Sequence, residues 1–188
     1  YIPVRDPLIS MEGAEWIPLP NSLLGRFRVA AGGQMFHRSD GLYGKGYSIC
    51  LRCGRGDSTT FTGERPKSLD GHKRLRGGKL NDREQSCPGN DEDWAIQDGL
   101  RLGALTRSEI VEIQLRGLNG EPLDEAGAYT LSVALRRSLC ALLGIDESEI
   151  GALAIPSRDD QGRNYSLYLY DTASGGAGFV SQVPSLFD

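Results

Sequence analysis

The sequence lacks the features that mark several common protein classes. No apolar run reaches the roughly 18 residues that a membrane-spanning helix needs, and no basic segment followed by an apolar one leads the chain. Four cysteines in 188 residues are too few for a disulfide-dense secreted scaffold. The sequence therefore predicts a cytoplasmic protein that has no membrane partner.

Charge of one sign is not in excess either. The chain has 21 basic and 25 acidic residues, and its formal net charge of -4 argues against a protein coated in basic surface for nucleic acid. A phosphate-binding loop is also missing, because Gly44-Lys45-Gly46 has no glycine five residues before Gly44 and no Ser or Thr after Lys45. The sequence therefore predicts no nucleotide-binding loop of this type at Gly44-Lys45-Gly46.

The most informative stretch runs from Cys50 to Cys87. It opens with Cys50-Leu51-Arg52-Cys53-Gly54 and closes with Cys87-Pro88-Gly89. Two thiolates separated by two residues can face one ion, because the turn between them folds the backbone back and the following glycine relieves crowding. In a reducing compartment such a pair indicates metal binding before it indicates a disulfide. We interpret the pair as a zinc knuckle.

Tetrahedral zinc needs two further ligands. Cys87, in its Pro-Gly turn, is the natural third ligand. The fourth is either His72, inside the loop that the other three would close, or Cys140, in a predicted helix. We favour His72, because a thiol in an apolar helical stretch is typical of a small buried side chain. The predicted cofactor is zinc, and the predicted ligands are Cys50, Cys53, His72 and Cys87.

A basic segment lies between the cysteine pair and Cys87. Residues 65–83 contain seven basic and two acidic residues, a net charge of +5, so that the remainder of the chain carries -9. Such a segment can meet the phosphates of DNA, although a run of like charges is more often a solvated loop. Its basic residues are Arg65, Lys67, Lys73, Arg74, Arg76, Lys79 and Arg83.

The first half of the chain predicts an arm and several strands. Four prolines within residues 1–30 suit an extended arm, and residues 23–30 predict a strand that ends at a turn at Gly32-Gly33. Residues 100–104 and 110–115 alternate apolar and polar side chains, which predicts two strands joined as a hairpin near Thr106-Arg107-Ser108.

The second half predicts a helix followed by another hairpin. The helix begins at Asp124 and runs to about Leu143, with Gly144 as its C-terminal stop. Strands are predicted over residues 150–155 and 165–170. The apolar face of the helix is expected to comprise Leu131, Leu135, Leu139 and Leu142. We therefore expect an α+β fold in which a mixed or antiparallel sheet is covered by helices and carries a zinc-knuckle loop insertion.

A glycine-rich corner closes the informative part of the chain. A predicted strand ends at Asp171 and is followed by Gly175, Gly176 and Gly178. Glycines at such a corner let backbone amides approach an anion, and α/β enzymes often place a catalytic acid there. The favoured interpretation is structural: the turn packs closely and Asp171 caps it.

Three motifs together resemble one known family. They are Gly-Tyr-x-Ile-Cys-x-x-Cys-Gly over residues 46–54, Cys-Pro-Gly over 87–89 and Leu-Tyr-Asp-Thr-Ala-x-Gly-Gly-Ala-Gly over 169–178. Their order is similar to that of the MrfA zinc-binding, or MZB, domain family over about residues 20–180. Members of this family are usually C-terminal modules of large bacterial DEAD/DEAH-box helicases, or stand in the helicase partner protein of the DISARM phage-defence system.

The resemblance implies a non-catalytic, zinc-stabilised accessory module of a DNA-repair or antiviral-defence machine. Its partner is expected to be a helicase domain in the same chain or in another chain, and DNA is expected to be contacted through residues 65–83. We expect one MZB-like domain over residues 1–188, as a fragment of a larger protein. Its parts are an N-terminal arm and strand over 1–45, a zinc-binding loop region over 46–90 and an α+β core over 91–188.

Two other functions compete with this one. A hydrolase or nucleic-acid-modifying domain would use an open zinc ion, or Asp171 beside the glycine-rich corner. A redox module would use Cys50 and Cys53, but such a pair needs a helix that starts at the cysteines, and the glycines at 54 and 56 disfavour one.

Overall fold

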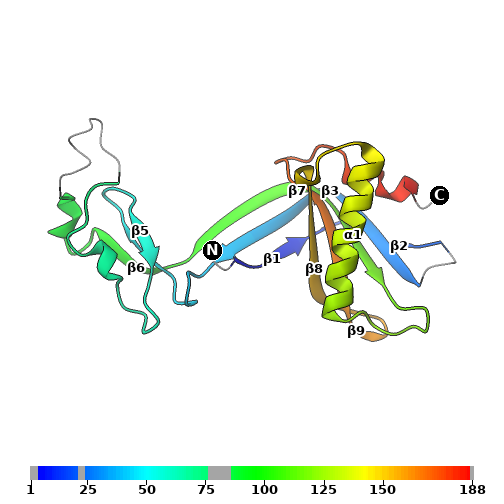
Figure 1. The fold of residues 1–188 in the computed structure, drawn as a ribbon, viewed down its shortest axis with the longest axis horizontal. Coiled ribbons are helices and arrows are strands. Elements are labelled where there is room, and N and C mark those ends of the chain that lie inside the picture. The colour runs from blue at the N-terminus through cyan, green and yellow to red at the C-terminus, as the bar shows by residue number, and fades with distance from the viewer. Residues whose placement is uncertain (1–3, 21–23, 76–85, 187–188) are drawn as a thin grey trace. The chain divides into compact units, whose positions relative to one another are not determined.

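The structure is a computed structural model that describes residues 4–20, 24–75 and 86–186. The chain forms two compact units, coloured along the chain in Figure 1. Unit 1 comprises Tyr1–Pro7 and His37–Ala104, and unit 2 comprises Leu8–Phe36 and Leu105–Asp188. The long strands β3 (Gly25–Ser39) and β7 (Leu102–Leu115) each carry the chain from one unit into the other. That the chain behaves as a single domain stays a prediction.

The larger sheet, which supplies the core of unit 2, has the strand order β1-β3-β7-β9-β8, in which β2 also pairs with β3. The additional strands are β1 (Val4–Ser10), β2 (Ile17–Pro18), β8 (Ile150–Asp159) and β9 (Gly162–Asp171). β9 pairs antiparallel with both β7 and β8. The predicted hairpin in the last third of the chain is therefore confirmed, with strands several residues longer than predicted. The α+β expectation holds in a sheet-dominated form with few helices.

The helix α1 (Glu125–Leu143) covers one face of this sheet (Figure 1). Asp124 caps its first turn by accepting a hydrogen bond from the backbone N–H of Gly127, and Gly144 ends it in the left-handed conformation. Leu139 is buried, and Leu131 and Leu135 pack against the same core as predicted. Leu142 does not, since 69% of it is exposed. The core also contains Val111, Ile113, Ile150, Leu167 and Leu169.

Unit 1 has a smaller sheet with the order β5-β4-β6. Its strands are β4 (Tyr47–Cys50), β5 (Gly56–Ser58) and β6 (Ile96–Leu100). The described residues between β5 and β6 include the short 3₁₀ turns η1 (Lys67–Leu69) and η3 (Pro88–Asn90). Two more, η4 (Glu147–Glu149) and η5 (Val180–Leu186), belong to unit 2. No helix of the described residues is long and apolar enough to cross a membrane.

The hairpin predicted over residues 100–115 is wrong. β6 pairs with β4, whereas β7 is one continuous strand whose partners include β9. Thr106-Arg107-Ser108 form no turn, because the buried Ser108 hydroxyl donates to the carbonyl of Asp171 across the sheet. The polar side chain of Ser108 therefore completes the hydrogen bonding of a neighbouring strand and does not mark a loop.

Gly32 and Gly33 do not form the predicted turn either, because β3 runs through both. A Cβ atom at Gly33 would lie 2.6 Å from Cδ1 of Ile110, whose side chain is fully buried. Glycine is therefore required by close packing within a strand and not by a change of direction.

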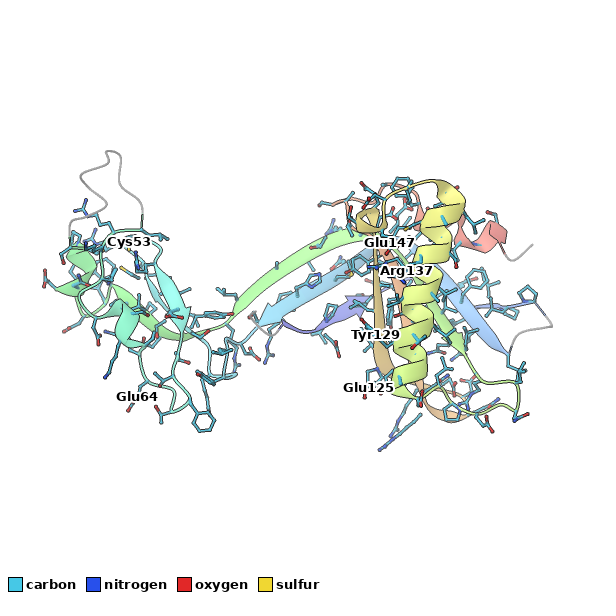
Figure 2. The ribbon with its side chains drawn as sticks, viewed as in Figure 1. Cys53, Glu64, Glu125, Tyr129, Arg137 and Glu147 are labelled. Atoms are coloured by element: carbon cyan, nitrogen blue, oxygen red, sulfur yellow. The ribbon has the colours of Figure 1, made fainter. Side chains whose placement is uncertain are left out.

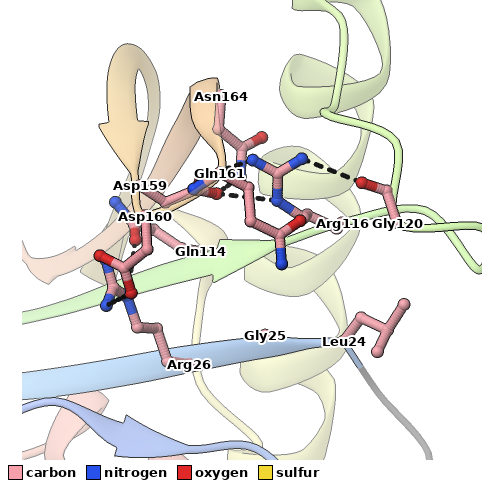
Figure 3. Close-up of a pocket in the computed structure, with 10 residues that line it drawn as sticks. All are labelled: Leu24, Gly25, Arg26, Gln114, Arg116, Gly120, Asp159, Asp160, Gln161 and Asn164. Carbon is pink, nitrogen blue, oxygen red and sulfur yellow. Dashed lines mark hydrogen bonds and ion pairs between the residues drawn. The ribbon is translucent and has the colours of Figure 1, made fainter.

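A partly buried ion pair ties the sheet of unit 2 to the loop before α1 (Figure 3). The guanidinium of Arg116 donates to both carboxylate oxygens of Asp159 and to the carbonyl of Gly120. Asp159 also accepts hydrogen bonds from the Gln161 backbone and the Asn164 side chain. The bond from Arg116 is the main cause that lowers the pKa of Asp159 to about 2, against the opposing effect of burial.

This ion pair predicts a stability loss in acid. Because the folded-state pKa lies below the ordinary one, the stabilisation is complete above about pH 4 and is lost as the pH falls towards 2. Between about pH 5.5 and pH 2.5 the wild type is expected to lose about 1.5 kcal/mol more unfolding free energy than the Asp159→Asn variant. Urea unfolding at both pH values measures the difference. Equal losses of unfolding free energy in the wild type and in Asp159→Asn would show that the ion pair does not lower the pKa of Asp159.

Candidate metal centre

The Cys-x-x-Cys pair lies at the end of β4 and in the turn that follows. Cys50 is the last residue of the strand, and its carbonyl accepts a hydrogen bond from the backbone N–H of Gly54 at 2.8 Å. Gly54 adopts a φ of 77°, a conformation that glycine reaches without strain. The turn brings Cys53 back towards the thiol of Cys50, as the knuckle interpretation requires.

The second half of the centre is held by its own backbone bonds. Cys87 immediately precedes η3, and its N–H donates to the carbonyl of His72 at 3.0 Å. The side-chain amide of Asn90 donates to the same carbonyl. Lys73 and Ser86 form an isolated antiparallel bridge beside these contacts. Residues 15 positions apart in the sequence are thus fixed as neighbours.

The four predicted ligand atoms lie within 4.8 Å of one another. The sulfurs of Cys50 and Cys87 are 3.8 Å apart, and the sulfur of Cys53 lies 3.4 Å from Nε2 of His72. Tetrahedral zinc with bonds of about 2.3 Å to sulfur and about 2.0 Å to nitrogen separates its ligand atoms by roughly 3.5–3.8 Å. The residues present therefore fit a zinc ion, and they would supply three thiolates and one imidazole.

His72 is oriented as a ligand of this kind needs to be. Its Nδ1 lies 2.9 Å from the carbonyl oxygen of Leu69, so Nδ1–H donates there and the lone pair of Nε2 faces Cys53. A hydrogen bond from the second ring nitrogen to a carbonyl is the usual way in which proteins fix a metal-binding tautomer. The imidazole is 4% exposed, which keeps it in this orientation.

The thiols differ in acidity in the absence of a cation. Burial raises the pKa of Cys53, but hydrogen bonds from the backbone of Arg55 and Leu75 and from the side chains of Cys87 and His72 lower it to about 6. Burial raises the pKa of Cys87 to about 11. A bound cation would favour the thiolate form of all the cysteines of the centre, including Cys87 with its raised pKa.

Arginines and a glycine complete the surroundings. Arg52 makes two hydrogen bonds to the carboxylate of Glu92 and lies 4.8 Å from the centroid of the Trp94 ring. A cavity of about 220 Å³ lies against Cys53 and is lined in part by Arg52 and Arg74. Gly89 approaches closely, since a Cβ atom there would lie 2.8 Å from the Cys50 sulfur. Sequence reasoning gave these residues no role at the centre, although Gly89 lies only two positions after Cys87.

The other sequence candidates lie elsewhere. Cys140, the alternative fourth ligand, is buried in the apolar core of unit 2. Asp171 is fully buried, and its carboxylate accepts four backbone N–H bonds, which agrees with the capping interpretation. Arg65 pairs with Asp98, so it is not free to meet phosphate. Arg76, Lys79 and Arg83 lie outside the described residues.

Cys53, labelled in Figure 2, marks the centre within unit 1.

One comparison with known proteins, the match to a family model, bears on the family. Residues 131–188 match the model of the MrfA Zn-binding domain, MZB. No curated protein matches the chain. A solved structure described as a DUF1998 helicase MrfA bound to DNA aligns with 99% of this chain at 9% identity and a TM-score of 0.46. This chain covers 20% of that protein.

The family match includes α1 from Leu131 onward, the β8-β9 hairpin and the glycine-rich corner, whereas the four clustered ligands precede it in sequence. The predicted cofactor is confirmed, because MZB is a zinc-binding domain and the described residues contain a possible zinc site. Residues 131–188 of this chain are thus similar to an MrfA Zn-binding domain, the family that the sequence motifs also resemble.

Proposed function

We propose that this chain is a non-catalytic, zinc-binding accessory module of a helicase-associated DNA-processing protein. The observation that carries the proposal is the set of four protein ligands, three of them buried, at distances that suit one tetrahedral ion. Structural zinc sites are closed by four protein ligands, whereas catalytic ones keep a position open for water. Zinc here would hold three separate segments of unit 1 together, through Cys50, Cys53, His72 and Cys87.

Cobalt substitution tests the closed site. Co²⁺ bound to the full-length chain is expected to give the intense visible absorption of a tetrahedral site with thiolate ligands, at one ion per chain. Addition of cyanide or azide should leave the spectrum unchanged, because no coordination position is open. A spectrum that shifts with either anion would show an open site and would favour the hydrolase alternative.

The helicase partner is proposed from the family alone. The helicase domain would lie in the same protein or in a partner chain, in a DNA-repair or antiviral system. Unit 1 contains thirteen basic and eleven acidic residues, and unit 2 contains eight and fourteen. DNA is therefore proposed to approach unit 1, where the exposed Lys67 and Lys73 flank His72 in sequence.

The contribution of these lysines is testable by a salt series. The double variant Lys67→Gln/Lys73→Gln is expected to weaken binding to duplex and single-stranded DNA in mobility-shift assays. The slope of log K against log salt should become shallower by about two, since each phosphate contact contributes about one. Lys45→Gln, which removes an exposed lysine of unit 1 outside the segment, serves as the control. Unchanged slopes in the double variant would remove DNA contact from the proposal.

A further inference from the structure

A cavity of about 620 Å³ lies in unit 2, at the end of the β8-β9 hairpin and beside the residues that lead into α1. β8 is the edge strand of the sheet, so the cavity lies at a border with no further strand of the described chain. Its volume falls within the range of about 300–1,000 Å³ that is usual for small-molecule sites. Its lining includes Pro122, Leu123, Pro156, Arg158, Arg163 and Tyr165.

Two arginines of this lining stand directly opposite each other. Arg158 of β8 and Arg163 of β9 are partners in the antiparallel register. Directly opposite side chains begin about 4.5–5.5 Å apart at Cβ, and like charges in such a pair are destabilising. Neither guanidinium has an acidic or other hydrogen-bond partner within residues 4–20, 24–75 and 86–186. Both residues are exposed, so solvent screens part of their repulsion, and both remain open to an anion at the wall of the cavity.

At a neighbouring cavity, the acids of the same hairpin form ion pairs with two other arginines. That cavity, of about 210 Å³, is drawn in Figure 3. There Arg116 is neutralised by Asp159, and Arg26 by Asp160. The two acids of the hairpin are thus engaged with these arginines, and Arg158 and Arg163 are left without one. The negative charge that Arg158 and Arg163 lack is one that a bound anion would supply.

The rest of the cavity is built from fixed groups. Asn164 accepts a hydrogen bond from the Leu123 backbone N–H and donates to the Leu115 carbonyl, which ties the segment before α1 to the start of β9 and the end of β7. The hydroxyl of Ser157, also in the lining, is buried and has no partner within the described part of the chain. Pro156 and Tyr165, which are register partners, add an apolar surface beside the arginines.

We infer that this cavity binds a phosphomonoester of nucleotide size, through the cross-strand pair Arg158 and Arg163, with its organic part against Tyr165 and the prolines. Two guanidinium groups match the several oxygens of one phosphate, because each can donate two parallel hydrogen bonds. The acidic balance of unit 2, eight basic against fourteen acidic residues, disfavours a long polyanion and favours a ligand with a single phosphate group. Such a group is carried by a free nucleotide or by the 5′ end of a DNA strand.

Calorimetric titration of the full chain tests this inference and separates the two sources. The ligands are inorganic phosphate, dAMP, and two octathymidylates that differ only in a 5′-phosphate or a 5′-hydroxyl. Binding of dAMP is expected, and Arg163→Gln should weaken it by about tenfold or more, as should Arg158→Gln. If the 5′-phosphorylated strand binds more tightly than dAMP, the source is a strand end; if it binds more weakly, the source is a free nucleotide.

The matched control is Arg137→Gln, which removes the same charge from an exposed position on α1 (Figure 2) and should leave dAMP binding unchanged. Both cavity variants should melt slightly higher than the wild type, because each relieves the repulsion between like charges. The inference fails if neither phosphate nor dAMP binds at about 10 mM. It also fails if the 5′-hydroxyl strand binds as well as the phosphorylated one, or if Arg163→Gln binds dAMP like the wild type. All the residues involved lie in unit 2, so these results are separate from any loss of zinc in unit 1.

Discussion

Removal of zinc is expected to unfold unit 1 and to leave unit 2 folded. The buried apolar cluster around the site contains Cys50, Leu69, Cys87 and Ile96, so two of its four members are themselves ligands. So small a core cannot offset the chain entropy of unit 1 without the ion. In small metal-dependent domains, structural zinc binds with an apparent free energy of roughly 10–16 kcal/mol, which also stabilises the fold. Unit 1 would lose this contribution when zinc is removed.

Hydrogen exchange after chelation, and in the Cys87→Ser variant, measures this outcome. Amides of β4 and β6 are expected to lose about 100-fold or more of their protection, since local stability there would fall towards zero. Amides of the β8-β9 hairpin should exchange as before. Zinc content should fall from one ion per chain to substoichiometric values. Retained protection in β4 at zero zinc would show that the ion has no structural role.

The cysteine in the helix provides the matched control. Cys140→Ala removes a thiol from the core of unit 2, so zinc content should not change, whereas His72→Gln should lower zinc affinity by at least about tenfold. The opposite pattern, with zinc lost in Cys140→Ala and kept in His72→Gln, would replace His72 by Cys140 as the fourth ligand.

Replacement of Asp171 by asparagine is expected to destabilise unit 2 by about 3–5 kcal/mol. One carboxylate oxygen accepts the backbone N–H groups of Ala177, Gly178 and Phe179 at 2.6, 2.8 and 3.2 Å, and the other accepts that of Val180 at 3.1 Å. An amide would place an N–H₂ group against at least one of these donors. It would also remove the negative charge that strengthens all four bonds.

Urea unfolding of the full chain measures this loss as a shift of the unit 2 transition. Asp146→Asn is the control, because that exposed aspartate caps η4 through a hydrogen bond from the Ser148 backbone and should cost no more than about 1 kcal/mol. Equal effects of the two variants would mean that the buried carboxylate is not needed to hold the glycine-rich corner. Zinc content should be unchanged in both.

Local patterns were sufficient for the regular elements of unit 2. The cap at Asp124, the glycine stop at Gly144 and the leucine spacing predicted α1 almost to the residue. The β8-β9 hairpin followed in the same way from alternating side chains on either side of a polar turn. These signals act between residues that are close in sequence, so they can be read without knowing the partners.

The metal centre was predictable for a related reason. Cys50 and Cys53 share one turn, and only two histidines and two further cysteines remained to complete a set of four. The structure gathers Cys87 and His72 around that turn. That Arg52, Asn90 and Gly89 would support the site was not visible, because their contacts depend on the path of the backbone.

The sequence by itself determined the helix, the last hairpin, the family and a set of residues suited to zinc. Only the tertiary structure decided that β7 continues through residues 106–108 to pair with β9, that Gly33 makes room for Ile110, and that Arg158 faces Arg163 without an acid. Ile110 of β7 pairs with Tyr170 of β9, 60 positions further along the chain, and the acids of the β8-β9 hairpin pair with arginines 43 and 134 positions away. Side-chain periodicity carries no information about which distant segment will lie alongside.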